Sequence, residues 1–391
     1  MTANRMEKKR IGIITIFDVD NYGAELQAFA LQHKLRQLGH DAELIRYLFG
    51  KHPLHQRDKN EKIIVPLDFK KKLKVSLLPL IENLKTLPFK NTRNRRRENF
   101  DNFHKSFSKT TTDTYPSVNS LNRAQMDYDV YCVGSDQVWN YTFGFSLSPY
   151  FLDFVPPNKK KISFASSFGV SELPDHALEE YKKGLGKFDS LAVREESGAE
   201  LVKKITGKKA TVVLDPTLLL NKKEWSEFSD DRYCPNQPYL LLYVVTLIPS
   251  KYARELAKKI ASEHKLKIVR ICRDAAPEDY GSNIINIRDA GPSDFVGLIK
   301  NASFVVTNSF HGTVFSINFS VPFYSIVRKS KNNNSRLSNI LKKVKLQERL
   351  VFSGDSYPDT SKALISMDEA DEIIGLERKN SEKYLIQAIS C

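Results

Sequence analysis

One stretch of the sequence decides the fold: Ala302-Ser-Phe-Val-Val-Thr-Asn-Ser-Phe-His-Gly-Thr-Val-Phe-Ser-Ile-Asn-Phe-Ser-Val-Pro-Phe-Tyr-Ser-Ile-Val-Arg328. Its apolar run at 304–306 predicts a short buried strand, 312–319 predicts a helix, and 323–327, after a proline, predicts a second strand. The polar residues at 307–309 are typical of a turn and a helix N-cap. This order of strand, helix and strand indicates a parallel α/β sheet.

His311 falls where the first of these strands ends and the helix begins. In open α/β sheets, ligands bind outside the carboxyl ends of the strands, and the N–H groups at a helix start favour anions. Histidine changes its protonation near neutral pH, so His311 is a candidate catalytic residue. Ser309 and Gly312 are candidate contacts for an anionic donor, and Asn308 is a candidate substrate-binding residue. The alternative, a surface histidine in a loop, remains open.

A second strand, helix and strand unit opens the chain. We expect a strand at 10–17, a helix at 24–38 and a strand at 41–47. The turn between the first two holds the candidate substrate-binding residues Asn21, Tyr22 and Gly23. The sequence has no Gly-x-Gly-x-x-Gly pattern there and no Walker pattern, so a dinucleotide or P-loop site is not indicated.

Two further strand ends carry polar side chains. The predicted strand at 128–133 is followed by Ser135, Asp136 and Gln137, which are candidates for substrate binding. Asp136 is either a general base or a helix-capping residue. Arg194 ends the predicted strand at 190–194 directly before a helix, which is a favourable position for an anion contact.

The length of 391 residues and the repeated α/β rhythm predict two domains. We place the first at residues 1–221 and the second at 222–391, the latter with a C-terminal helical tail from about residue 367. The expected architecture is two Rossmann-like domains facing each other across a cleft.

The formal net charge of +14 is concentrated in one segment, since residues 59–109 hold 14 Lys and Arg against five Asp and Glu, a balance of +9. This segment lies in a predicted insertion at about 50–110. It is either a basic amphipathic arm for a membrane surface or partner, or a solvated helical insertion. The surplus suits nucleic acid, anionic lipid or an anionic small substrate, and no nucleic-acid-reading motif is present.

The compartment and metal content are predicted from what the sequence lacks. The four cysteines are scattered without a Cys-x-x-Cys pair, which is typical of a reducing compartment and argues against a structural zinc site. We recognise no signal peptide and no apolar run long enough to span a bilayer. We therefore expect a cytoplasmic protein with no metal site.

Six short motifs occur in an order that resembles the polysaccharide pyruvyl transferase family: Asn21-Tyr-Gly-Ala-Glu-Leu-Gln27, Gly134-Ser-Asp-Gln-Val-Trp-Asn140, Ser163-Phe-Ala-Ser-Ser-Phe-Gly169, Val193-Arg-Glu195, Leu214-Asp-Pro-Thr217 and Ser309-Phe-His-Gly312. The resemblance covers roughly residues 10–345. The basic segment lies outside its pattern.

The resemblance implies a glycosyltransferase-B-like arrangement of the two domains and no cofactor. It implies phosphoenolpyruvate as the donor co-substrate and a pair of sugar hydroxyls as the acceptor, often on a lipid-linked glycan or cell-wall precursor at the inner membrane face. His311 matches the catalytic histidine of the family, and Arg194 matches an arginine that holds the donor. Many members have an arginine two residues before the histidine, where this chain has Ser309, so another cation is needed for the donor. Arg194 is the first candidate. Arg336, at the start of a predicted helix, is the second, and the alternative for Arg336 is an exposed residue without a role in binding.

Two other functions are compatible with the sequence. One is a nucleotide-sugar glycosyltransferase of the same architecture. The other is a non-catalytic basic protein that binds anionic lipid or nucleic acid through residues 59–109, of which nucleic acid is the less favoured ligand because the chain lacks a reading motif.

Overall fold

The structure is a computed structural model that describes residues 7–59, 61, 63, 90–245, 250–273, 277–329 and 335–390. The chain divides into two compact units, unit 1 with Met1–Asp215 and Lys383–Cys391, and unit 2 with Pro216–Glu382. The division therefore falls after residue 215, whereas the sequence led us to expect it after 221. The reason is that the carbonyl groups of Thr217 and Leu220 accept hydrogen bonds from Asn318 Nδ2, within unit 2, at 3.2 and 2.8 Å.

Unit 1 is built on a parallel sheet. Its four main strands, in the spatial order β2-β1-β3-β4, are β1 (Arg10–Ile14), β2 (Asp41–Leu44), β3 (Val130–Val133) and β4 (Lys160–Ser163). A parallel pair, β5 (Ala192–Val193) and β6 (Thr211–Val212), adjoins β4 through isolated bridges at Ile162–Ser190 and Ser166–Val193. All four residues of β3 are buried, as expected for a parallel strand covered on both faces.

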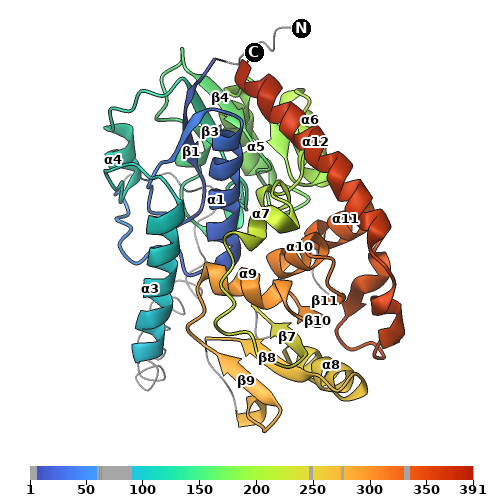
Figure 1. Ribbon diagram of the computed structural model, residues 1–391. Helices are drawn as coiled ribbons and strands as arrows, with labels where there is room; N and C mark the ends of the chain where they lie inside the picture. The colour runs from blue at the N-terminus through green and yellow to red at the C-terminus, as the bar shows by residue number, and fades with distance from the viewer. Residues whose placement is uncertain are drawn as a thin grey trace, which may run out of the picture. The chain divides into compact units, whose positions relative to one another are not determined.

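Five α-helices lie in the described part of unit 1: α1 (Tyr22–Gln37), α3 (Lys90–Phe107), α4 (Val118–Asn122), α5 (Asp175–Gly186) and α6 (Glu196–Thr206). Two 3₁₀ segments, Tyr141–Phe143 and Ser148–Phe151, follow β3. Helix α3, which comes from the basic segment, runs beside α1 (Figure 1). Residues 60, 62 and 64–89 of that segment, which include the lysines at 70–72, lie outside the described residues.

Unit 2 contains a six-stranded parallel sheet in the order β12-β11-β10-β7-β8-β9. Its strands are β7 (Tyr239–Tyr243), β8 (Lys267–Ile271), β9 (Ile284–Ile287), β10 (Phe304–Thr307), β11 (Phe323–Val327) and β12 (Leu350–Phe352). Counted within the unit and from the β9 edge, the order is 3-2-1-4-5-6. This is the strand order of a Rossmann sheet.

The described helices of unit 2 are α7 (Lys222–Ser226), α8 (Ser250–Glu263), α9 (Pro292–Lys300), α10 (Phe310–Asn318), α11 (Ser335–Lys343) and the greater part of α12 (Asp368–Ser390). Short 3₁₀ segments lie at Pro216–Leu218, Pro277–Asp279, Gln347–Arg349 and Thr360–Leu364. None of the helices among the described residues has both the length and the apolarity to cross a membrane.

Both sheets have a topological switch point, where the strand order reverses. In unit 1 it lies between β1 and β3, and in unit 2 between β7 and β10. Connections from the two neighbouring strands leave toward opposite faces of the sheet at such a point, so the loops at their carboxyl ends separate and a ligand can bind there. The switch points therefore indicate where each unit is built to hold a ligand.

Candidate functional site

The switch point of unit 2 joins the ends of β7 and β10. Asn308 directly follows β10, and its side-chain Oδ1 accepts a hydrogen bond from the backbone N–H of Val245, two residues beyond β7, at 2.8 Å. The Asn308 side chain is half-buried. The loop after β10 is thus tied to the loop after β7, and the candidate residues at 308–312 lie at the ligand-binding edge of the sheet.

A buried polar network fixes the start of α10. Ser309 is the N-cap, and its hydroxyl accepts from the N–H of Gly312 at 3.2 Å. The Ser309 N–H donates to Thr307 Oγ1 at 3.0 Å, and that hydroxyl donates to the carbonyl of Tyr243 at 2.7 Å. A Cβ on Gly312 would come within 2.6 Å of Thr307 Oγ1, so the close approach of helix and strand requires glycine here.

His311 lies in the first turn of α10, because the helix begins at Phe310, two residues earlier than the sequence predicts. The residue is 8% exposed, and its ring meets the ring of Phe310 edge to face at 5.2 Å between centroids. The guanidinium of Arg336, in the first turn of α11, lies 5.9 Å from the centroid of the same Phe310 ring. The structure therefore brings His311, Phe310 and Arg336 into one neighbourhood.

The switch point of unit 1 is held by side chains between β1 and β3. Thr15, just after β1, donates through its hydroxyl to the carbonyl of Ser135 at 2.8 Å. Gln27 of α1 donates to Thr15 Oγ1 at 3.1 Å and to the carbonyl groups of Ile16 and Ala24. Both Thr15 and Gln27 are fully buried, so the two loops that hold the predicted substrate residues of this unit have a rigid base.

Of the predicted residues after β1, only Asn21 is exposed. Its Oδ1 accepts from the N–H groups of Gly23 and Ala24 at 3.0 and 3.3 Å, which makes it the N-cap of α1. Tyr22 is 1% exposed, and its hydroxyl accepts from Arg96 Nη1 of α3 at 2.5 Å. Tyr22 and Gly23 are therefore buried at the start of α1, where they support the loop from the protein interior.

Asp136 has a left-handed backbone, with φ of 68°, directly beyond the end of β3. Such a conformation is costly for a residue other than glycine and is frequent at functional sites. Its carbonyl accepts from the N–H of Ser167 at 2.9 Å, which holds the turn, and its side chain is only partly exposed. The neighbouring Gln137 is half-buried and accepts through Oε1 from Asn140 Nδ2 at 2.8 Å.

Arg194 lies in a buried ionic cluster. Its Nη1 donates to Asp215 Oδ2 at 2.7 Å and its Nε donates to Glu195 Oε1 at 3.0 Å, while its Nη2 lies 4.0 Å from Asp136 Oδ1. Ser135 Oγ is 3.1 Å from the same Asp215 oxygen. Burial lowers the pKa of Arg194, but the carboxylates of Glu195, Asp215 and Asp136 outweigh it and the net pKa is raised. One guanidinium thus faces three carboxylates, so this edge of unit 1 is acidic.

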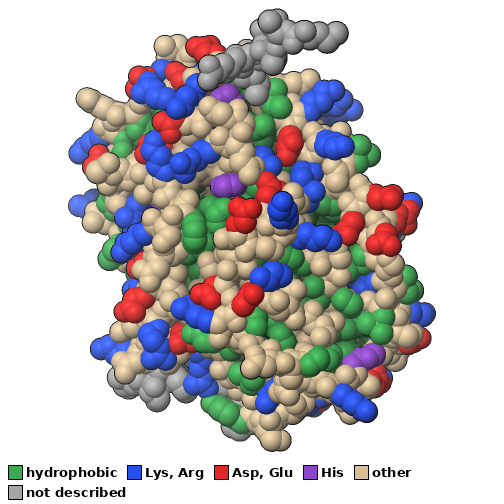
Figure 2. Space-filling view, viewed as in Figure 1, with side chains coloured by type: hydrophobic (Ala, Val, Ile, Leu, Met, Phe, Trp, Pro, Cys, Tyr) green, Lys and Arg blue, Asp and Glu red, His purple; other side chains and the backbone are tan. Residues whose placement is uncertain are grey.

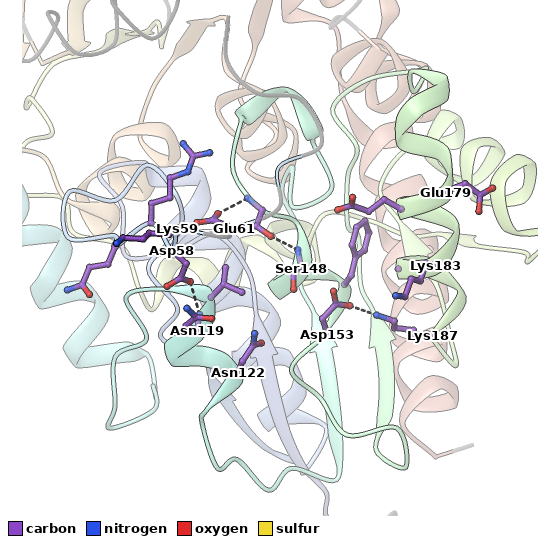
Figure 3. A pocket seen from close by; sticks show the side chains of 17 residues that line it. Asp58, Lys59, Glu61, Asn119, Asn122, Ser148, Asp153, Glu179, Lys183 and Lys187 are labelled. Carbon is purple, nitrogen blue, oxygen red and sulfur yellow. Dashed lines mark hydrogen bonds and ion pairs between the residues drawn. The ribbon is translucent and has the colours of Figure 1, made fainter. Parts of the chain in front are cut away.

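A pocket of about 930 Å³ in unit 1 contains none of the predicted site residues (Figure 3). It is lined by residues 56–59 and 61, by α4, by residues between 146 and 153, and by residues between 179 and 187 in and just after α5. Its charged groups are partly paired with one another, for example Lys187 with Asp153, and its one aromatic residue, Phe151, is 2% exposed. It therefore lacks the exposed aromatic platform or the surplus of one charge that would indicate a specific ligand.

A sequence model of the family described as polysaccharide pyruvyl transferase matches residues 21–330. The match includes Asn21 and the start of α1, the Asp136 turn, Arg194 and the start of α10. This chain belongs to the polysaccharide pyruvyl transferase family. No match was found among curated protein sequences.

Solved structures resemble the fold of this pyruvyl transferase family member over nearly its whole length. A putative UDP-N-acetylglucosamine 2-epimerase from Listeria monocytogenes matches with a TM-score of 0.52 and 12% identity, covering 98% of this chain and 91% of that one. UGT89C1 from Arabidopsis thaliana, complexed with quercetin, matches with a TM-score of 0.50 and 12% identity, covering 98% and 100%. These likenesses confirm the predicted class of two Rossmann-like α/β domains of the glycosyltransferase-B type.

Sequence reasoning did not find the residues that support the site. The hydroxyls of Thr313 and Ser325 lie 2.5 Å apart and tie α10 to β11, and Arg96 reaches the loop after β1 from α3, a helix for which the sequence analysis gave no bounds. The spacing of Arg96 with Phe100, Phe103 and Phe107 is the signal that could have revealed Arg96 as an inward-facing residue.

Proposed function

We propose that this chain transfers the pyruvate unit of phosphoenolpyruvate to two hydroxyls of one sugar in a bacterial surface-glycan precursor, forming a pyruvyl ketal. The observation that carries the proposal is the position of His311 at the switch point of unit 2, in a chain of the polysaccharide pyruvyl transferase family. The acceptor would be a lipid-linked glycan, and the protein would act in the cytoplasm at the inner membrane face, with no cofactor, metal or nucleic acid.

The proposed chemistry joins both acceptor oxygens to C2 of phosphoenolpyruvate and breaks the bond between C2 and the phosphate oxygen. The methylene carbon gains one proton and becomes a methyl group. The two hydroxyls lose two protons, of which one balances that gain and the other leaves with inorganic phosphate. A histidine held at the reacting group is suited to one of these transfers, which typically contributes about 10²–10⁴-fold to the rate. We assign that role to His311.

We assign the donor to unit 2. The donor carries a phosphate and a carboxylate, which need cations and backbone N–H groups. Arg336 offers a planar fork that matches both groups and lies close to Phe310, the neighbour of His311. In this proposal Ser309 and Gly312 hold the first turn of α10 in place, and Asn308 sets the loop beside it.

We assign the sugar hydroxyls to the switch point of unit 1. Carboxylate and amide oxygens accept hydrogen bonds from hydroxyls, and Asp136, Gln137 and Asn21 supply such groups. The excess of carboxylates around Arg194 favours an uncharged sugar over an anion at this edge. Ser135, Tyr22 and Gly23 support this surface from inside, and Arg194, which the family resemblance assigns to the donor, is tested separately below.

Ligand-induced stabilisation tests the proposal against its main alternative, a nucleotide-sugar glycosyltransferase, which the shared fold favours. A ligand that binds only the native state increases the free energy of unfolding, by about 2.7 kcal/mol at one hundred times its Kd, and so raises Tm. We expect phosphoenolpyruvate to raise Tm and UDP-glucose and UDP-N-acetylglucosamine to leave it unchanged. Release of phosphate from phosphoenolpyruvate across a panel of lipid-linked glycans would then identify the acceptor. Stabilisation by a nucleotide sugar alone would overturn the assignment.

A further inference from the structure

One face of helix α3 packs against α1. Arg96, Phe100, Phe103 and Phe107 follow one another at spacings of four, three and four residues, which places them on one side of a helix. Phe100 meets Tyr22 at 5.1 Å between ring centroids, and Phe103 meets Phe29 at 5.4 Å. Arg96, Phe100 and Phe103 are all buried. The apolar side of this basic helix is therefore used inside unit 1.

Arg96 is the polar member of this face, and it reaches the loop between β1 and α1. Its Nε donates to Asp20 Oδ1 at 2.5 Å, and its Nη1 donates to the Tyr22 hydroxyl at 2.5 Å. The guanidinium also lies over the Tyr22 and Phe100 rings, 4.6 and 5.2 Å from their centroids. The Arg96 side chain is 6% exposed and that of Asp20 is 42% exposed. The arginine therefore contacts the loop from the protein interior, and Asp20 at the tip of the loop stays in contact with solvent.

Other contacts hold the same loop at its base. Arg46 Nε donates to Asp18 Oδ2 at 2.8 Å, and Asp18 has a left-handed backbone with φ of 58°. Glu25 Oε1 accepts from the N–H of Val19 at 3.0 Å, and its Oε2 lies 3.6 Å from Nδ1 of His104, one more residue of α3. Both carboxylates of the loop therefore meet an arginine, and α3 contacts the loop or its base at two points.

We propose that α3 is a positioning element for substrate binding, with Arg96 as the positioning residue that holds the β1–α1 loop and cancels the charge of Asp20. The proposal rests on the proposed function in one respect, the assignment of the acceptor to this switch point. Without Arg96, the loop loses the hydrogen bonds that Arg96 donates to Asp20 and to the Tyr22 hydroxyl, and the Asp20 carboxylate loses the guanidinium that offsets its charge.

Hydrogen exchange tests the positioning role in the protein without ligand. We expect Arg96→Gln to speed exchange of the backbone amides at 18–24 severalfold, because local opening of the loop becomes easier. Arg97→Gln is the matched control, since Arg97 is the next residue, carries the same charge and is exposed. Tyr22→Phe removes one of the two hydrogen bonds with little change in shape and should give a smaller increase. Equal exchange at 18–24 in Arg96→Gln and Arg97→Gln would overturn the proposal.

Kinetics tests whether the loop serves the acceptor. With phosphoenolpyruvate and the most active lipid-linked glycan of the panel, we expect Arg96→Gln to raise KM for the glycan severalfold and to leave KM for phosphoenolpyruvate unchanged. A purely structural defect would lower kcat through loss of active protein and leave both KM values as they are, and that result overturns the positioning role. If Arg96→Gln exchanges faster at 18–24 but phosphoenolpyruvate does not raise the Tm of the wild type, then Arg96 does hold the β1–α1 loop and the proposed function is rejected.

Discussion

His311 is the residue on which most of the chemistry depends, and its surroundings explain why a sequence can point to it. The capping serine, the glycine that allows close packing and the threonine at the end of β10 are all needed to start a helix directly at a strand end. These local requirements leave a recognisable pattern in the chain. The neighbours that come from distant positions, such as Arg336, leave no such pattern.

His311→Ala is expected to reduce turnover by about 10²–10⁴-fold, the usual contribution of a positioned acid or base. We expect Tm to fall by only a few degrees, because truncation removes the ring contact with Phe310 and leaves the capping network of α10 in place. His176→Ala, at an exposed histidine in α5, serves as the control and should retain full activity. Phosphate release and thermal unfolding of the purified variants measure both quantities, and full activity in His311→Ala would refute the assignment.

Arg336→Lys and Arg194→Lys separate the two candidate donor arginines. Lysine loses the two-pronged geometry, so we expect Arg336→Lys to lower kcat/KM for phosphoenolpyruvate at least tenfold, about 1.4 kcal/mol. The family resemblance predicts a similar decrease for Arg194→Lys, which should also lower Tm because the hydrogen bonds of Arg194 to Asp215 and Glu195 are buried. Lys342→Gln, exposed on the same helix as Arg336, is the control. Wild-type donor kinetics in Arg336→Lys would direct the search to Arg328 or Lys329.

Helix α3 shows how an element can be misjudged from composition alone. Its charge suggests a surface arm, but its aromatic face is buried against α1, and Arg96, which lies between Arg95 and Arg97 in the sequence, is buried and bonded to the β1–α1 loop. The amphipathic pattern is real, and what the sequence does not say is which surface covers the apolar side. A helix of this kind can lie on a membrane or on its own domain, and only tertiary packing decides.

The outer face of α3 carries the remaining prediction of membrane binding. Figure 2 shows Lys and Arg side chains, with some acidic ones between them, over the region of α3. We expect binding to vesicles that contain anionic lipid, weakened by salt and by Arg95→Gln with Arg97→Gln, since each basic residue near the surface contributes about 1 kcal/mol. Arg96 is buried and should not contribute through lipid contact. Equally poor cosedimentation with anionic and neutral vesicles would exclude this role.

Glu25, in α1, predicts a dependence of stability on pH. Burial raises its pKa above the ordinary value, although His104 and the Val19 N–H act in the opposite direction. A raised pKa means that the folded state favours the protonated form, so its stabilisation is complete below the unfolded pKa and is lost as the pH rises through the folded one. We expect Glu25→Gln to have a higher Tm than the wild type at pH 7.5 and a smaller advantage at pH 4.5. A gap in Tm that is the same at both values would contradict this account.

At the scale of the molecule, the sequence predicts the two α/β halves and the strands β1, β2, β3, β5, β10 and β11 correctly, because buried parallel strands are short apolar runs bounded by turn residues. It does not predict the strand order, which is set by how crossovers pack. The two switch points, and hence the reason why Asn308 and Asp136 lie at ligand-binding edges, appear only when β7 is seen beside β10 and β1 beside β3. The predicted cleft between the domains stays a prediction.

Unit 1 needs the end of the C-terminal helix α12, so it can complete its fold only late in translation. Residues from Lys383 onward group with unit 1, where the Tyr384 hydroxyl donates to the carbonyl of Ser163 at 3.0 Å and Lys160 Nζ donates to that of Ile389 at 3.3 Å. Domains generally fold as the ribosome releases them, the first before the second. Here the first unit lacks a piece that is translated after the whole of the second. A released chain that ends at residue 382 should therefore expose β4 of unit 1 to protease, whereas the released chain that continues through residue 390 should protect it.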